Sequence, residues 1–377
     1  MSALRRVALS AIGVLSSFGL ACALFVLLGL LTWLGTLEQA HTGLYDVQRK
    51  YFESYALVHD AGGVPIPLPG ANLVLSLLAL NLVLGGIVRL RRSRETVGIL
   101  VAHLGILLLL GAGLVKHRAS DDGRVTLYEG QSASWFESDY RWELAVRERH
   151  PDGTTREHVT PFDGVLLARD EAPVTVEVPG APFSLEVREA HSNSRPFAAV
   201  DDGGPSLRPL ARDPETPRNL PGARVALVWG GAPLETLVWG AQSAPFGAVV
   251  DGRRFEIDLR RERHALPFTL TLEDFRKVDH PRSNMPRSFE SDVVVDGDRR
   301  LTISMNEPLR QGGVVVYQAS WGPQGAGPGA RLFSTFAVVR NPADQLPLVA
   351  CLVIAAGLVG HFGRRLARHM RLEGCRR

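Results

Sequence analysis

Residues Val97–Val115 form one long apolar run, VGILVAHLGILLLLGAGLV, whose only ionisable side chain is His103. At about 1.5 Å per residue, a helix of this length crosses most of a hydrocarbon core roughly 30 Å thick. Hydrocarbon offers an imidazole no hydrogen-bond partner, so His103 requires one inside the protein. Two interpretations are open: a hydrogen bond to a neighbouring helix, or coordination of a metal or haem iron, which neutral imidazole ligates well.

Three further apolar runs have the length of membrane spans. The first extends from Val7 to about Leu34, too long for the apolar region of a cleaved signal peptide, and is predicted to be retained. The second covers roughly Ala71–Val88 after the helix-stopping segment Pro65–Pro69, and its Asn81 is predicted to hydrogen-bond another helix. The fourth is Leu346–Phe362. The chain is therefore predicted to cross the membrane four times.

Positive charge follows these runs in a pattern that predicts their orientation. With four spans, the N-terminus, the loop between the second and third spans, and the C-terminus fall on one face, which the positive-inside rule makes cytoplasmic. We therefore expect a multi-pass protein of the cytoplasmic (inner) membrane, with both termini inside and the large domain periplasmic or extracytoplasmic. The arginines concerned are Arg5, Arg6, Arg89, Arg91, Arg92, Arg94, Arg364, Arg365, Arg368 and Arg371.

These features predict a membrane protein with an α-helical four-span anchor and a large all-β extracytoplasmic domain. Residues 1–115 would form three transmembrane helices, with an extracytoplasmic interfacial segment at 35–70. Residues 116–345 would form the β-rich domain, and residues 346–377 the fourth transmembrane helix and a basic cytoplasmic tail.

The β domain is predicted from short segments that alternate apolar and polar residues, such as RRFEIDLRRE, LPFTLTLEDF and GGVVVYQASWG. A sandwich or open barrel is expected. The Asp296-Gly297 pair predicts a hairpin turn. The proline-rich stretch 192–222 is interpreted as a long surface loop or an insertion, and 322–330 as a flexible turn.

Several functional classes receive no support from the sequence. The net charge is only +3 and the arginines lie at membrane edges, so no nucleic-acid partner is expected. The β domain lacks cysteine and the motifs of serine hydrolases, zinc proteases and P-loop enzymes. Its histidines are widely scattered, and no catalytic residue is assigned.

The chain nevertheless resembles the ResB family (CcsB-type) of System II cytochrome c biogenesis proteins over nearly its full length. The motifs that carry this resemblance occur in the expected order. They are Gly35, Thr36 and Gln39 of GTLEQ followed by Tyr51-Phe52, His103 with Leu104-Gly105, PFTLTLEDF (267–275), PRSFESDVVV (286–295), Met305, Asn306, Pro308 and Leu309 of MNEPL, and Tyr317-Gln318.

The resemblance implies a subunit that handles haem b in transit. Family members act with a CcsA/ResC-like multi-span protein to carry haem outward and present it to apocytochrome c for covalent attachment, and a thioredoxin-like thiol reductant is a further implied partner. The family's haem-ligating histidine corresponds to His103, and His361 is the candidate for a second histidine in the last span. The partner's tryptophan-rich motif is absent from this chain, so a non-catalytic or co-catalytic subunit of the haem lyase complex is expected.

Two other functions stay open at this point. One is a membrane scaffold or chaperone that stabilises the partner or apocytochrome without binding haem, with His103 as a packing residue. The other is a membrane-anchored envelope sensor or binding module. For His361 at the edge of its span, an interfacial histidine beside arginines is the simpler interpretation.

Overall fold

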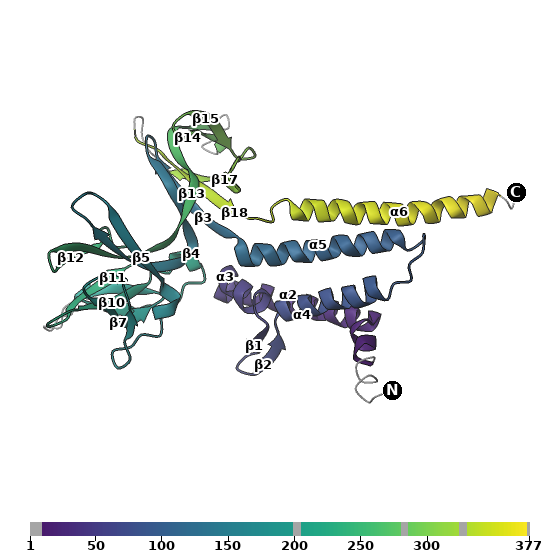
Figure 1. Ribbon diagram of the computed structural model, residues 1–377, viewed down its shortest axis with the longest axis horizontal. Coiled ribbons are helices and arrows are strands. Elements are labelled where there is room, and N and C mark those ends of the chain that lie inside the picture. The colour runs from purple at the N-terminus through teal and green to yellow at the C-terminus, as the bar shows by residue number, and fades with distance from the viewer. Residues whose placement is uncertain (1–9, 199–204, 280–285, 324–329, 375–377) are drawn as a thin grey trace. The chain divides into compact units, whose positions relative to one another are not determined.

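The computed structural model describes residues 10–198, 205–279, 286–323 and 330–374. The chain divides into two compact units, a helical unit from the segments before Asp121 and after Arg340, and a β unit of Asp121–Arg340 (Figure 1). Arg5 and Arg6 lie outside the described residues, as does most of the predicted turn at 322–330.

The helical unit contains four helices that are long and apolar enough to cross a membrane. They are α2 (Phe18–Thr42), α4 (Ala71–Asn81) with its π-helical continuation η2 (Leu82–Val88), α5 (Val97–Ala119) and α6 (Leu346–Gly374). Much of their apolar surface is exposed: the exposed fraction is 63% for Phe25, 74% for Val26 and 73% for Val359. Such surfaces suit contact with lipid or with other helices. Together with the β unit, they confirm the predicted fold class.

The first apolar run is broken, which corrects the predicted span of Val7 to Leu34. The helix that covers residues 10–15 ends at Ser16, and Ser17 caps α2 by accepting a hydrogen bond from the Leu20 amide at 3.2 Å. The helix α2 contains no proline and continues to Thr42, where it ends because Gly43 adopts a positive φ of 88°.

Asn81 connects α4 to this break. Its side-chain amide donates hydrogen bonds to the carbonyl oxygens of Leu15 and Ser17, at 2.7 and 2.9 Å. These carbonyl groups lie on either side of the helix break; that of Ser17 also accepts the Ala21 amide at 3.4 Å, and Asn81 itself is 9% exposed. The predicted hydrogen bond from Asn81 to another helix is therefore confirmed.

The predicted interfacial segment at 35–70 contains both helical turns and a hairpin between α2 and α4. It forms α3 (Leu44–Val47), the π-helix η1 (Gln48–Phe52), and a hairpin of β1 (Ala56–Asp60) and β2 (Pro65–Pro69). The prolines stop a helix, as expected, but they form an edge strand, which tolerates the loss of their amide protons. His59 is paired with Ile66 in this hairpin.

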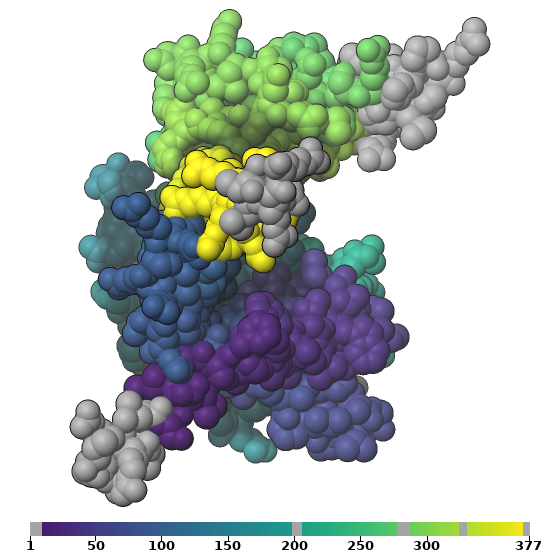
Figure 2. Space-filling view, turned by 90° about the vertical axis from the view of Figure 1, so that its right-hand side faces the viewer, coloured from purple at the N-terminus to yellow at the C-terminus, as the bar shows by residue number. Residues whose placement is uncertain are grey.

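Helices α5 and α6 pack closely through small residues (Figure 2). A side chain at Gly98 would approach the Gly357 carbonyl oxygen to 2.6 Å, and one at Gly105 would approach the Ile354 side chain to 2.7 Å. Ala350, from α6, is fully buried. Small residues are the usual means by which membrane helices come close enough for tight packing.

The β unit is organised around two long antiparallel strands, β4 (Ser132–Arg149) and β13 (Arg253–Asp279). The sequence pattern predicted several shorter strands in place of each, whereas each strand is continuous and contributes residues to two cores. Their pairing shifts between Arg261 and Arg263, where the strands leave one core for the other. The remaining strands are β3 (Asp121–Tyr128), β5 (Thr155–Pro161), β6 (Val174–Val176), β7 (Ser184–His191), β8 (Ser194–Ala198), β9 (Pro205–Pro209), β10 (Gly222–Val228), β11 (Leu234–Trp239), β12 (Phe246–Val250), β14 (Pro286–Val295), β15 (Arg299–Ser304), β16 (Leu309–Gln311), β17 (Val314–Gly322) and β18 (Phe333–Arg340).

One core is a sandwich and the other resembles an open barrel. In the first, the sheet β11-β10-β7-β6 covers the halves of β4 and β13 that pair with β5 and β12. In the second, the order β15-β14-β13-β4-β3-β18-β17-β16 curls until β15 lies against β17. Both predicted β architectures are therefore present, one at each end of the long strands.

Two local predictions in the β unit have different outcomes. The hairpin turn at Asp296-Gly297 is confirmed, with φ of 54° and 83° between β14 and β15. The predicted surface loop at 192–222 is wrong in part, because β8 and β9 pair there and the Trp239 indole donates to the Ser194 carbonyl at 2.9 Å. Pro196, Pro205 and Pro209 hid these strands from the sequence pattern.

Candidate functional site

His103 lies on α5 against the π-helical end of α4. Its Nδ1 is 2.8 Å from the carbonyl oxygen of Gly86, which belongs to η2. That carbonyl is near the C-terminal end of the helix, where no later backbone amide is placed to donate to it. The last hydrogen bond there is donated by the Arg89 amide to the Leu84 carbonyl, at 3.0 Å.

This hydrogen bond fixes the protonation pattern of the His103 ring. A carbonyl oxygen only accepts, so Nδ1 must carry the proton. In the neutral ring Nε2 then keeps its lone pair, which is the arrangement commonly found in metal-bound histidines. No hydrogen bond of Nε2 to a described residue is found, and the ring is only partly buried.

The contact between His103 and η2 depends on a glycine. A Cβ atom at Gly86 would lie 2.7 Å from Nδ1 of His103 and 2.9 Å from Cδ1 of Leu82. The preceding Gly85 serves a different contact, since a Cβ there would lie 2.7 Å from the Ser16 carbonyl oxygen. The two neighbouring glycines therefore allow close approach to two different segments.

This arrangement fits one axial position of a haem. The porphyrin supplies four nitrogen ligands to the iron, so the protein needs to offer only an axial group at each face. His103 offers one imidazole with an available Nε2 in apolar surroundings. Among the described residues, no group of three or more His, Cys, Asp or Glu side chains is placed to hold a bare metal ion.

His361 contacts a different part of the unit. Its Nδ1 is 3.1 Å from the Glu95 carbonyl oxygen, in the loop before α5, and its ring meets Phe362 edge-on. Arg364 and Arg368 bind the same loop, with 2.5 Å bonds to the Arg94 carbonyl and the Glu95 carboxylate. No contact between His361 and His103 is found in the described structure, and their hydrogen-bond partners, Glu95 and Gly86, belong to separate elements.

The GTLEQ motif contributes to a pocket at the end of α2. Gly35, Thr36 and Gln39 line an open cavity of about 310 Å³. Gly35 is buried, and a Cβ there would lie 3.3 Å from Val47. The other lining residues are Leu44, Val47, Gln48 and Phe52.

The late motif divides between an exposed turn and the barrel core. Met305 and Asn306 lie between the paired residues Ser304 and Glu307, and Met305 is 55% exposed. Pro308 follows this turn. Leu309 begins β16 and is buried against β17.

Gln318 forms a closed ring of hydrogen bonds inside the β unit. The Ser291 hydroxyl donates to Gln318 Oε1 at 2.7 Å, and Gln318 Nε2 donates to the Ser334 hydroxyl at 2.6 Å. The two serine hydroxyls are 2.8 Å apart, so Ser334 donates to Ser291 and completes the ring. Tyr317 precedes it on β17, paired with Ala337. Gln318 thus has a structural role in the family motif.

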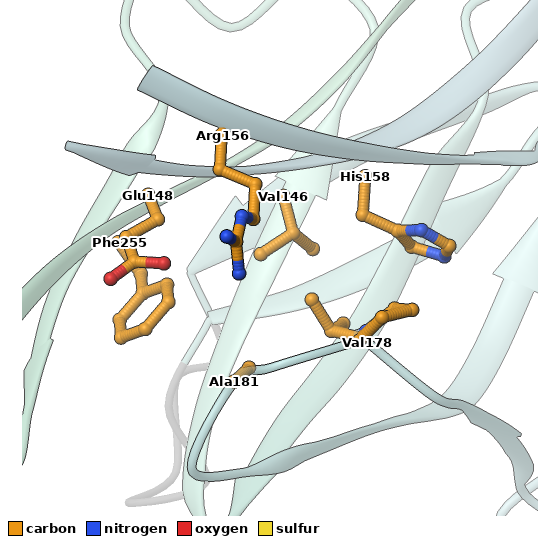
Figure 3. Close-up of a pocket in the computed structure, with 8 residues that line it drawn as sticks. Val146, Glu148, Arg156, His158, Val178, Ala181 and Phe255 are labelled. Atoms are coloured by element: carbon orange, nitrogen blue, oxygen red, sulfur yellow. The ribbon is translucent and has the colours of Figure 1, made fainter. Parts of the chain in front are cut away.

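A small pocket in the sandwich offers little room for a ligand. Glu148, Arg156, His158 and Phe255 line it together with Val146, Val178, Pro179 and Ala181 (Figure 3). Its volume of about 10 Å³ admits roughly one water molecule. Glu148 is engaged by the Arg253 guanidinium at 2.7 Å.

A polar cluster that the sequence analysis missed lies between α2, η1 and β1. Tyr51 donates to Glu38 Oε2 at 2.6 Å, and Nδ1 of His59 lies 2.5 Å from the same phenol oxygen. Lys50 donates to Glu38 Oε1 at 2.7 Å. The available signal was partial: Glu38 and Tyr51 belong to motifs that carry the family resemblance, but only the fold brings them together with Lys50 and His59.

A search of curated proteins found no match to this chain. The model of the ResB-like family matches residues 246–330, which extend from β12 to the residues after β17. This region contains the MNEPL and Tyr-Gln motifs on which the resemblance was based, as well as Gln318 and Ser291 of the hydrogen-bond ring. The suspected resemblance is therefore confirmed over this segment, which is similar to the ResB-like family.

Proposed function

We propose that the chain is the haem-handling subunit of a System II cytochrome c synthetase. In this role it helps to carry haem b across the membrane and presents it to apocytochrome c. The single observation that best supports the proposal is the hydrogen bond from Nδ1 of His103 to Gly86, which leaves Nε2 available for haem iron. The ResB-like match adds an association with cytochrome c biogenesis.

We place the helical unit in the cytoplasmic membrane, with both termini inside and the β unit outside. The arginine-rich loop before α5 and the arginines of α6 support this orientation. His103 would then lie in the inner half of the bilayer, where haem arrives from the cytoplasm. The substrate would be held by one imidazole of this chain, with its second axial ligand supplied by His361 or by a partner.

A CcsA/ResC-like partner and apocytochrome c complete the proposed assembly, together with a thiol reductant for the apocytochrome. The exposed apolar faces of the four helices offer surface for a multi-span partner. The exposed Met305-Asn306 turn of the family segment is a candidate contact for the partner or for apocytochrome c.

The proposal is tested by co-expressing the chain with its multi-span partner and a reporter cytochrome c. We expect His103→Ala to abolish covalent haem attachment, and added imidazole to restore part of it by occupying the vacated position. His41→Ala is the matched control, because His41 is an exposed histidine on α2. Normal attachment in the His103→Ala strain would favour a scaffold role without haem binding.

A further inference from the structure

We propose that His59 is a second haem-iron ligand of this chain, oriented by Tyr51 and Glu38 at the other end of α4 from His103. This inference rests on the proposed function, because it assigns a second position to the same substrate. It does not require His59 and His103 to bind one haem together.

The Tyr51 phenol determines which His59 nitrogen carries a proton. A phenol has one proton, and an ionised carboxylate only accepts, so the 2.6 Å contact places that proton between Tyr51 and Glu38. A tyrosine phenol carries its proton at neutral pH, so it has only this one proton to donate. The Tyr51 oxygen is then the acceptor in the 2.5 Å contact with His59, whose Nδ1 is the donor.

Nε2 of His59 is consequently the nitrogen available for a ligand. It forms no hydrogen bond with any described residue. It is also not among the fully buried side-chain atoms that lack a partner, so it is not sealed from a ligand. The His59 side chain is 17% exposed, so the ring is held by its surroundings without being sealed. A histidine anchored through Nδ1 with Nε2 open is the arrangement that favours iron ligation.

The cluster is rigid at the side opposite to Nε2. Tyr51 has no exposed surface, and Lys50 holds the second oxygen of Glu38 at 2.7 Å. The hairpin contributes apolar surface beside the imidazole: Ile66, the cross-strand partner of His59, is 39% exposed. An apolar flank of this kind suits the face of a porphyrin, which is largely hydrophobic.

His59 and His103 lie near opposite ends of α4 and its π-helical continuation. The β1–β2 hairpin precedes the first residue of α4, whereas Gly86, which holds His103, lies near the other end of its π-helical continuation (Figure 1). The helical rise between Ala71 and Gly86 amounts to roughly 20 Å. The chain would therefore offer one imidazole to haem at each end of the same helix.

A structural role for His59 is the competing explanation. If the ring were doubly protonated, it would form an ion pair with Glu38, whose Oε2 lies 3.6 Å from Nδ1. It would then hold the hairpin to α2 without binding a ligand. This explanation predicts that His59 influences stability and leaves haem binding unchanged.

The test is titration of the purified full-length chain in detergent with ferric haem, followed by the Soret band. The variants are His59→Gln, His103→Ala and the double variant, with His41→Ala as control. His59→Gln keeps an amide donor toward Tyr51 but lacks the imidazole. We expect each single variant to retain part of the bound haem and the double variant to lose it.

The outcomes separate this inference from the proposed function. If His59→Gln binds haem as the wild type does and the double variant equals His103→Ala, His59 is structural and only this inference is overturned. If His103→Ala is unaffected and His59→Gln loses the band, the His103 assignment fails while this one stands. Wild-type spectra in every variant would contradict both.

A second variant tests the orienting role of Tyr51. Tyr51→Phe keeps the buried ring and removes the acceptor for Nδ1, so we expect haem affinity of the His59 position to fall by about tenfold or more. The titration is performed in the His103→Ala background, where only that position remains. An unchanged affinity would show that Tyr51 does not position the imidazole.

Discussion

The carbonyl oxygen of Gly86 and Nδ1 of His103 are 2.8 Å apart, and this hydrogen bond joins the end of one helix to the middle of the next. It satisfies an unpaired backbone carbonyl and the intramembrane imidazole at the same time. It also gives His103 the tautomer whose Nε2 can bind iron. From the sequence, the hydrogen bond to a helix and the ligation of iron were alternative roles for His103. In the structure the two roles are compatible, because they use different nitrogens of the ring.

Substituting Gly86 should damage the His103 position more than substituting its neighbour. Gly86→Ala places a methyl group 2.7 Å from Nδ1 of His103, whereas Gly85→Ala places one 2.7 Å from the Ser16 carbonyl oxygen. Both variants strain helix packing, but only the first displaces the imidazole. We expect the two variants to lose a comparable amount of thermal stability, but only Gly86→Ala to shift or weaken the haem Soret band. Equal spectra for the two variants would contradict this account.

The Ser291–Gln318–Ser334 ring should contribute to stability as a unit. Gln318→Met retains the volume but leaves two buried hydroxyl groups without their partner, with an expected loss of about 1–3 kcal/mol in unfolding free energy. Denaturant unfolding of the full chain, monitored by tryptophan fluorescence, measures this loss. Gln311→Met is the control, because Gln311 accepts a surface bond from Arg299 at 2.9 Å. Equal losses in both variants would be inconsistent with a cooperative ring.

Arg261 should not tolerate replacement by lysine. Its guanidinium stacks 4.1 Å from the Trp142 ring centroid and donates to the carbonyl oxygens of Asp139 and Pro217, each at 2.7 Å. A lysine keeps the charge but lacks the planar fork needed for this geometry. We expect Arg261→Lys to lower the melting temperature by several degrees, and the exposed Arg254→Lys to change it little. Similar melting temperatures for the two would refute this role.

The stability of the β unit should depend on Asp292 at low pH. Hydrogen bonds from Arg276 lower the pKa of Asp292 below its usual value of 3.8. A folded-state pKa below the unfolded value stabilises the fold above the unfolded pKa, and this contribution disappears as pH falls through the folded pKa. As pH falls below about 4, the Asp292→Asn variant should therefore lose less stability than the wild type does. Thermal unfolding measured across this pH range tests the difference. If Asp292→Asn lost stability with falling pH as the wild type and the exposed control variant Asp298→Asn do, the role of Asp292 would be disproved.

The sequence predicted the features that depend on local hydrophobicity. Span length and apolar composition identified α4, α5 and α6, and the isolated amide of Asn81 was predicted to find a partner on another helix because hydrocarbon offers none. The Asp296-Gly297 turn was equally local, since both residues adopt positive φ readily.

The features that the sequence did not predict depend on contacts between distant segments. The β1–β2 and β8–β9 hairpins were missed because proline suppresses the usual strand pattern. The length of β13 was missed because its apolar pattern changes where it passes from one core to the other, near Arg261. The Gly86 partner of His103 and the Tyr51 partner of His59 follow from tertiary packing alone, so no spacing in the sequence reveals them.

The most direct test of the central claim is the absorption spectrum of haem that co-purifies with the chain and its partner. We predict a Soret band that is greatly weakened in His103→Ala, retained in His41→Ala, and partly restored by added imidazole while the complex stays assembled. A Soret band of unchanged position and intensity in His103→Ala would contradict the account, because the imidazole would then serve only to hold α5 against Gly86.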